Sequence, residues 1–185
     1  MAIGPRTAQA PITAADQQPS PFWRFSLRLY PAIADACLAL QDRFGVDVNV
    51  LLFLLWAAEG SRKVGAEDAR RVAAAVESWT RSVVVPLRTV RRALREPPEL
   101  VEPAAAERFR QRVKQVELEA ERLQQEGLHR LVPRDDLGEP EPSREVAARA
   151  NVEAYAALLG TTFAPPLVTA VLAGFRRLEQ DARDD

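Results

Sequence analysis

Glu126 and His129 have the residue types and the spacing with which helix-bundle proteins place a carboxylate and an imidazole on one face to hold iron. Such a site needs a second pair of this kind, and His129 is the only histidine of the chain. Cys37 is also the only cysteine, and one Cys with one His cannot complete a tetrahedral zinc site. The sequence therefore predicts no metal and no cofactor, a solvent-exposed His129, and a Cys37 that is buried as a small apolar residue.

Catalytic groups are also hard to assemble from this sequence. Its eight glycines are scattered, and none forms a Gly-rich loop between a strand and a helix that could cradle phosphate groups. An acid–base pair could be drawn from the carboxylates of Asp35, Asp42, Asp47 and Glu59. Acidic residues near helix ends usually cap the helix or stay solvated, however. We therefore predict no catalytic residue and favour a non-enzymatic protein over an enzyme.

Four polar side chains gather where one apolar segment ends and the next begins. They are Gln41, Asp42, Asp47 and Asn49. Each needs a hydrogen-bond partner if it is buried. The simpler interpretation is a capping network, in which Gly45 ends one helix and Asp47 caps the next. The alternative is a pocket for a small ligand or substrate at this junction, which a lining of Trp23, Trp56 and Asn49 would support.

Charge is divided along the chain, although its formal net charge is only −1. Residues 61–95 hold nine Lys or Arg against three acidic residues, whereas residues 96–185 hold twelve against eighteen. Four arginines, here called the arginine cluster, share a helix face by their spacing: Arg88, Arg91, Arg92 and Arg95. The simpler interpretation is that the cluster pairs with the acidic second half of the chain. The alternative is that it docks an acidic protein, and nucleic acid is the weaker partner because overall basic charge is lacking.

Aromatic residues concentrate in the first predicted helix, at Phe22, Trp23, Phe25 and Tyr30. Positions 22, 23, 26 and 30 fall on one side of that helix, so burial in the core is the expected role of these residues. The same role is expected for Trp56 and Trp79. An exposed member of the group, with Phe22 and Trp23 as candidates, would instead anchor a partner, because Trp and Tyr dominate interaction hot spots.

The elements that position these residues are all predicted to be helices, because strong helix formers dominate and alternating strand patterns are absent. Residues 1–19 are predicted to be a disordered arm. Pro21 opens a first helix that Pro31 is expected to stop, and a second helix then runs to Gly45. Residues 48–58 are apolar on every side, and we expect them to form the central, most buried helix, with no sheet anywhere.

Two further helical stretches follow in the basic and acidic parts of the chain. Residues 66–96 carry one or two helices with a break or kink near 82–86, because Pro86 removes a backbone hydrogen bond. Residues 104–131 form one long charged helix with a narrow apolar stripe, which packs as a coiled-coil seam. The stripe consists of Phe109, Val113, Val116, Ala120 and Leu123. Packing within the chain is the simpler interpretation, and a homodimer through residues 104–131 is the alternative.

The resulting organisation is a helical core domain at residues 20–131, a flexible acidic loop at 132–142 and a C-terminal helical pair at 143–181 that packs on the core. The loop is predicted to be flexible because it is almost free of large apolar residues. The strongest apolar run, residues 50–58, is far shorter than the roughly 20 residues that span a bilayer. With a single cysteine and no membrane span, the expected location is the cytoplasm.

Several segments of the chain resemble a known family. FWRFSLRLY, ACLALQDRFGVDVNVLLFLLW and VVVPLRTVRRALR, together with Trp79, are similar to an uncharacterised proteobacterial family, domain of unknown function 2390. The resemblance covers about residues 22–125. It implies a bacterial, cytoplasmic, all-helical protein, and it assigns no catalytic residue, cofactor or substrate.

Three hypotheses about function remain open from the sequence. The leading one is a helical protein that binds another macromolecule through the arginine cluster, the aromatic first helix or both. The second is a small-ligand binder or enzyme with a pocket around Asp42 to Asn49. The third is weak nucleic-acid binding by the arginine cluster.

Overall fold

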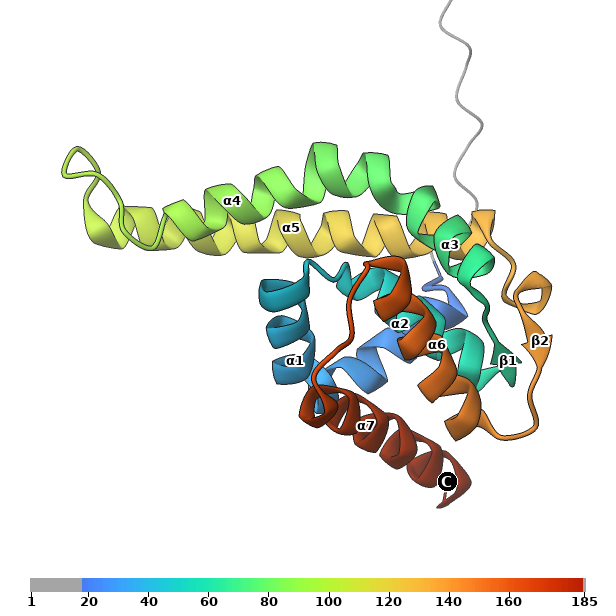
Figure 1. Cartoon of the computed structure of the whole chain (residues 1–185). Coiled ribbons are helices and arrows are strands. Elements are labelled where there is room, and N and C mark those ends of the chain that lie inside the picture. The colour runs from blue at the N-terminus through green and yellow to red at the C-terminus, as the bar shows by residue number, and fades with distance from the viewer. Residues whose placement is uncertain (1–17, 185) are drawn as a thin grey trace, which may run out of the picture.

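The computed structural model describes residues 18–184, and side chains for residues 18–178, as a bundle of helices with one short pair of strands (Figure 1). The predicted all-α fold class is confirmed. Most of the predicted N-terminal arm, residues 1–17, lies outside the described residues. The elements are α1 (Pro21–Phe44), α2 (Val48–Glu59), β1 (Arg62–Lys63), α3 (Ala66–Trp79), the π-helical turn η2 (Thr80–Val84), α4 (Val85–Ala93), α5 (Pro103–Leu131), the 3-10 turn η3 (Arg134–Asp136), β2 (Glu139–Pro140), α6 (Arg144–Leu158) and α7 (Pro165–Asp184).

A single helix, α1, replaces the two helices that were predicted on either side of Pro31. The prediction that Pro31 stops the first helix was therefore wrong. Proline bends the helix instead, and its two halves run in different directions in Figure 1. Leu29 and Ile33 flank the bend and are both buried in the core, so their burial offsets the lost hydrogen bond. Helix α1 ends where predicted, at Gly45, which has a left-handed φ of 68°.

The central helix is α2, as predicted. Every residue from Asn49 to Ala58 is buried. Asp47 caps the helix, because its carboxylate accepts hydrogen bonds from the backbone N–H groups of Asn49 and Val50. Helices α1, α3, α5 and α6 all contact α2, which gives its apolar surface a neighbour on each side. Although α2 is strongly apolar, no helix within residues 18–184 has both the length and the hydropathy to cross a membrane.

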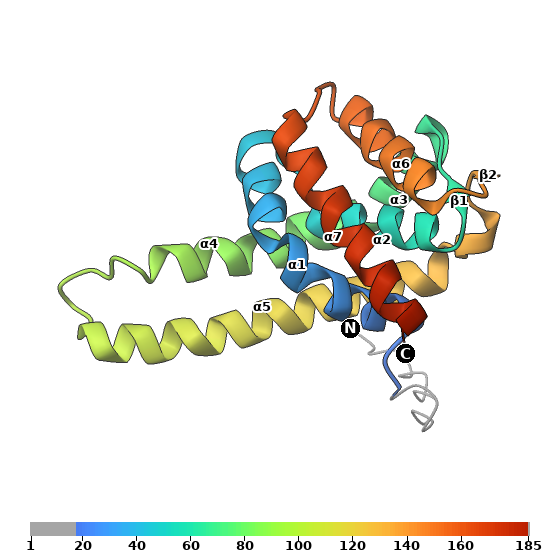
Figure 2. The same ribbon diagram turned by 90° about the horizontal axis from the view of Figure 1, so that it is seen from below.

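Helix α3, the turn η2 and helix α4 form one continuous arm that runs antiparallel to α5 and projects beyond the remaining helices (Figures 1 and 2). A break or kink was predicted near residues 82–86, and the helix is not interrupted there. It changes instead to a π-helical turn that ends at Val84, two residues before Pro86, and this turn accommodates the missing N–H of the proline. Helix α5 contacts α4 of the same chain, so the predicted seam within the chain is confirmed. Only part of the stripe is used, because Val113 and Ala120 are buried whereas Phe109, Val116 and Leu123 stay exposed.

A two-stranded antiparallel pair joins β1 to β2, so the prediction of no sheet anywhere was wrong. Strand β2 belongs to residues 132–142, a segment with more anchors than its composition indicates. Leu137 is completely buried, and the Arg62 guanidinium donates hydrogen bonds to the carbonyl oxygens of Leu137 and Gly138. The Gly138 N–H donates to Asp68. These contacts favour a fixed segment, and flexibility of the loop in solution stays a prediction.

The C-terminal helices complete the core. Ser143 caps α6 as predicted, and α6 packs against α2. Helix α7 packs along α1, where Gly174 allows a close approach: a Cβ atom at this position would lie 2.3 Å from Cγ2 of Ile33. Tyr155 of α6 and Phe175 of α7 are buried, so both helices contribute to the same core as α1 and α2.

Candidate functional site

Asp47 is the centre of the predicted polar junction. Besides capping α2, its Oδ2 accepts hydrogen bonds from the Thr80 hydroxyl at 2.7 Å and from Nε2 of Gln124 at 3.0 Å. Its backbone N–H donates to the Tyr155 hydroxyl at 3.0 Å. The capping interpretation therefore accounts for Asp47, and the contact with Gln124 extends the network into α5.

A chain of side-chain amides, here called the amide relay, continues from Asp47 through Gln124 and Asn49 to Gln125. Oε1 of Gln124 accepts from Nδ2 of Asn49 at 2.8 Å, and Oδ1 of Asn49 accepts from Nε2 of Gln125 at 2.7 Å. An ionised carboxylate can only accept hydrogen bonds, so Asp47 fixes the orientation of Gln124 and, through it, of the next two amides. The relay therefore ends on a carbonyl oxygen, Oε1 of Gln125.

Gln125 is one of the residues that line a pocket of about 300 Å³ between α1, α2, α4 and α5, here called the amphipathic pocket. Gln125 is 2% exposed and Ser26 of the same pocket is 3% exposed. Neither Oε1 of Gln125 nor Oγ of Ser26 forms a hydrogen bond with any described residue. The rest of the lining is largely apolar and includes Trp23, Leu27, Tyr30, Leu38, Leu52 and Leu118.

Two members of the arginine cluster form the charged wall of this pocket. Nε of Arg88 lies 3.1 Å from Oε1 of Glu117, and its Nη2 lies 3.0 Å from Oε1 of Glu121. Arg91 also donates to Glu117. Arg92 pairs with Asp42 at the surface, and Arg95 is exposed. Of the four arginines that were predicted to share a helix face, only Arg88 and Arg91 contact the acidic side chains of α5.

The two carboxylates of this wall respond differently to burial. Burial disfavours the ionised form of Glu117, but hydrogen bonds from Arg91 and Arg88 outweigh it and hold the pKa of that carboxyl below its usual value. Burial raises the pKa of Glu121, because the single partner Arg88 does not compensate for it. Burial also raises the pKa of Tyr30 on the opposite wall. Ion pairing of Glu117 is therefore the main electrostatic support of the α4–α5 contact.

Changing Glu117 to Gln keeps the side-chain size but removes the charge that Arg88 and Arg91 share. We expect the free energy of unfolding at pH 7 to fall by roughly 2 kcal/mol, because two half-buried guanidinium groups lose their carboxylate. A carboxyl whose pKa is lowered by folding stabilises the fold above its unfolded pKa, and this stabilisation is lost as the pH falls. The difference between variant and natural chain should therefore shrink below the ordinary glutamate value of 4.5.

Urea unfolding at pH 7 and pH 3 measures this difference. Glu107→Gln is the matched control, because Glu107 lies on the same helix in an exposed pair with Arg110 and should change stability much less. Equal effects of the two variants, or a Glu117→Gln effect that does not depend on pH, would contradict the assignment.

A second pocket of about 340 Å³ opens at the predicted junction between α1 and α2. Gln41, Asp42, Asp47 and Asn49 all line it. Gln41 and Asn49 line the amphipathic pocket as well, so the two hollows adjoin. The alternative interpretation, in which the junction residues line a pocket, therefore has a geometric basis. Of the three residues expected to line it, Trp23 and Asn49 line the amphipathic pocket. Trp56 lies instead at a separate hollow with Arg134.

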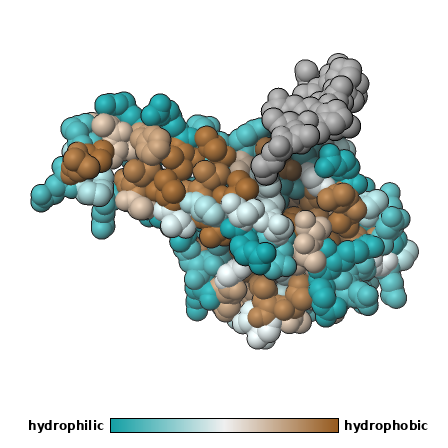
Figure 3. All heavy atoms as spheres, turned by 90° about the horizontal axis from the view of Figure 1, so that it is seen from above, coloured by the Kyte–Doolittle hydropathy of each residue, from teal (hydrophilic) through white to brown (hydrophobic). Residues whose placement is uncertain are grey.

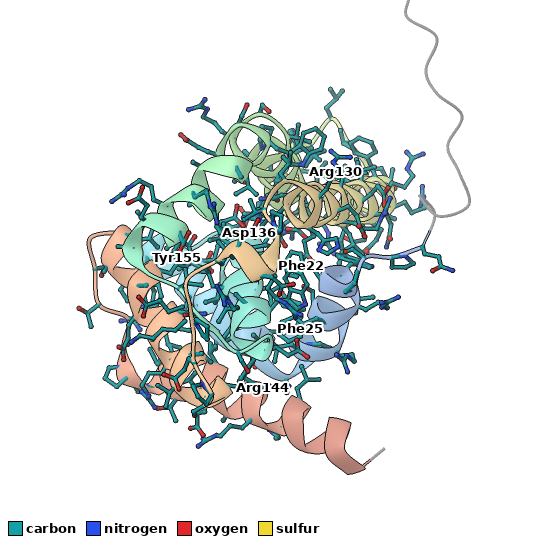
Figure 4. The ribbon with its side chains drawn as sticks, turned by 90° about the vertical axis from the view of Figure 1, so that its right-hand side faces the viewer. Phe22, Phe25, Arg130, Asp136, Arg144 and Tyr155 are labelled. Atoms are coloured by element: carbon teal, nitrogen blue, oxygen red, sulfur yellow. The ribbon has the colours of Figure 1, made fainter. Side chains whose placement is uncertain are left out.

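The remaining aromatic predictions are partly confirmed. Phe22 and Phe25 are buried between α1 and the core (Figure 4), and Trp56 is buried as expected. Trp79 was expected in the core, but it is 38% exposed, and its Nε1 donates to the carbonyl oxygen of Ala120. The cost of leaving its ring in solvent is limited by this hydrogen bond, which joins α3 to α5.

The candidate metal, thiol and acid–base residues do not form one centre. His129 was expected to be exposed, but it is partly buried with its ring edge-on to Trp56 at 5.2 Å, because α5 presses this part of its surface onto the core. Cys37 is buried as predicted, and burial raises its pKa to about 12. Glu59 pairs with Arg134 and Asp42 pairs with Arg92, and the two carboxylates line different hollows. In the described part of the chain, no three His, Cys, Asp or Glu side chains are grouped so that they could hold a metal.

A comparison with models of protein families shows to which family the chain belongs. A family model described as protein of unknown function DUF2390 matches residues 21–128, more than half of the sequence. The chain belongs to the DUF2390 family. No curated protein and no solved structure matches it significantly. The DUF2390 segment contains α1 to α4 and nearly all of α5, and so it contains the complete amide relay and both adjoining pockets.

The DUF2390 segment also includes the residues that sequence reasoning missed, namely Ser26, Thr80, Gln124 and Gln125. Both glutamines lie on a highly charged helix, where solvated polar side chains are the usual expectation. The available signal was their position beside Ala120 and Leu128, two apolar residues at helical spacing. Gln124 lies four residues from each of them, so this spacing places Gln124 on the buried side of α5.

Proposed function

We propose that this DUF2390 protein binds a small, mostly apolar molecule in the amphipathic pocket, and that the molecule carries an N–H or O–H donor. The observation that carries the proposal is the end of the amide relay, where Asp47 orients the amide of Gln125, a residue of the pocket wall whose buried Oε1 has no hydrogen-bond partner among the described residues. A buried acceptor without a partner costs about 1–3 kcal/mol. A ligand that donates to this oxygen regains that free energy.

The chemistry of the pocket walls supports an uncharged ligand. Trp23 and Tyr30 offer ring faces, and Leu27, Leu38, Val48, Leu52 and Leu118 add aliphatic surface. Arg88 and Glu117 neutralise each other within the chain. The volume of about 300 Å³ is at the lower end of the range for small-molecule sites, so a ring system of modest size fits best.

The ion pairs of the arginine cluster bear on the other hypotheses. The side chains of Arg88 and Arg91 are each only 19% exposed, and both are occupied by Glu117. This arrangement supports a structural use of these two arginines over the docking of an acidic protein or nucleic acid. We also propose a cytoplasmic location, because the single cysteine of the chain allows no internal disulfide.

Indole and N-methylindole are matched probes for this site, because they have nearly the same apolar surface and only indole has an N–H donor. We expect indole to shift the side-chain amide NMR signal of Gln125 and the indole signal of Trp23. Affinity for N-methylindole should be on the order of tenfold weaker, the value of one hydrogen bond to a buried acceptor. Equal binding of both probes, or no shift in the pocket residues, would refute the proposal.

Two variants separate the relay from general stability. Gln125→Leu removes the acceptor, and Asp47→Asn keeps the helix cap, because Asn and Asp cap equally well, but no longer fixes the direction of the amides. Both should weaken indole binding while N-methylindole binding changes little. Gln115→Leu, at an exposed position of α5, should leave both affinities unchanged.

A further inference from the structure

Helix α5 carries a second apolar edge that no described part of the chain covers. Phe109, Val116 and Leu123 are 45%, 54% and 46% exposed, although each is a large apolar residue. On the adjacent helical arm, Trp79 and Val90 are also exposed. We call these five residues the outer face. Figure 3 shows hydrophobic surface running along this arm, on the side turned away from the other helices.

The spacing of the outer face is that of a helix-packing surface. Residues seven apart lie almost in line, two turns along, so Phe109 to Leu123 make a straight ridge of roughly 21 Å. Val113 and Ala120, which alternate with them, are already buried against the chain itself. An α-helix with apolar residues beyond one packing edge is typical of a bundle with another neighbour. The ridge is far longer than a small-molecule site requires.

Charge beside the ridge indicates which partner fits it. Arg112 and Glu119 lie on the same flank, both exposed, at nearly equal distances in sequence on either side of Val116. In an antiparallel pairing of two α5 helices centred on Val116, Phe109 faces Leu123 of the other copy. Arg112 then lies opposite Glu119 of the other copy, and Glu119 opposite its Arg112. The flank is therefore complementary to itself when it is inverted, as a two-fold interface requires.

We propose that a second copy of this chain docks on the outer face, with the two α5 helices antiparallel and a two-fold axis close to Val116. The α4–α5 arms of the two copies then form a four-helix arrangement. The present pair between Glu119 and Arg122 does not prevent this, because an exposed pair three residues apart contributes little and exchanges readily. The interface uses surfaces other than the amphipathic pocket, so it stands independently of the proposed ligand.

Sedimentation and light scattering of the full chain test the association. The natural chain should be dimeric, and Val116→Glu should be monomeric, because two carboxylates would meet at the axis. Val116 is exposed within a single chain, so the Val116→Glu monomer should stay folded, with a cooperative thermal transition. Val146→Glu, an equally exposed position on α6, should leave the dimer intact. A natural chain that is monomeric at high concentration, or a Val116→Glu variant that stays dimeric, would overturn the proposal.

Charge reversal and cross-linking test the register. Arg112→Glu and Glu119→Arg should each weaken the dimer roughly tenfold at low salt, and the double variant should restore it. Val116→Cys should form a disulfide between copies on oxidation, because residue 116 faces itself at the axis, whereas Val146→Cys should not. Cys37 is buried and does not compete. Failure of both the restoration and the cross-link would exclude the antiparallel arrangement.

Discussion

Replacing Asn151 by Ala is expected to lower the free energy of unfolding by roughly 3–4 kcal/mol, because the side chain is fully buried and bonds three backbone groups. Its Nδ2 donates to the carbonyl oxygens of Leu54 at 2.9 Å and Arg62 at 3.0 Å, and its Oδ1 accepts from the Val64 N–H at 2.7 Å. These bonds tie α6 to α2 and to the segment that contains β1. Without them, groups that remain buried lose their partners.

Asn151→Asp should destabilise the fold at least as strongly at neutral pH. The carboxylate still accepts from Val64, but its other oxygen faces two carbonyl oxygens and cannot donate to them. Burial in this site raises the pKa of the introduced carboxyl, so its destabilising effect should grow as the pH rises and shrink in acid. Urea unfolding at pH 5 and pH 8 measures both variants. Glu153→Ala, an exposed change on the same helix, is the control, and a comparable loss there would contradict the interpretation.

Ending the chain after residue 132 is expected to abolish cooperative folding, although this piece retains the whole DUF2390 segment. It removes the buried side chains Val152, Tyr155, Phe163, Val171 and Phe175. Each contributes roughly 2 kcal/mol by burial, so their loss together is comparable to the whole net stability of a domain, about 5–15 kcal/mol. Helix α2 would also lose its cover by α6.

Circular dichroism and thermal unfolding of the shortened chain test this expectation. We expect a broad, weak transition and binding of a hydrophobic dye, since the apolar surface of α2 is uncovered. A sharp transition close to that of the full chain would show that the DUF2390 segment folds without α6 and α7.

The central helix and its cap could be predicted because their signals are local. Residues 48–58 are apolar in every direction, so their burial does not depend on which helices surround them. Asp47 and Gly45 act on backbone groups within a few residues. Pro31 was misjudged because its local cost is offset by burial on both sides of the bend, which becomes visible only in the tertiary packing. The strand pair was missed because two residues per strand are too few to form a pattern.

The candidate site could be predicted only in part, for the same reason. Asp47 and Asn49 were recognised as polar groups that need partners. Their partners, Gln124 and Gln125, lie about 75 residues further along the chain. Sequence spacing shows that these glutamines share a helix, but not which surface that helix covers. The direction of the amide relay depends on atoms from two segments that are far apart in sequence, so it follows from the packed structure alone.

The packing of α7 along α1 bears on the order of events during protein synthesis. Helix α1 is made early, yet the close approach of Gly174 to Ile33 cannot form until the ribosome has made about 140 residues more, counting from Ile33 to Gly174. In contrast, α4 and α5 are joined by a short connection and can pair as soon as both have emerged. The α4–α5 pair would then form while the core is still incomplete, with its apolar ridge from Phe109 to Leu123 exposed to solvent. Nascent chains of this protein are thus expected to need protection by a chaperone until α7 is in place.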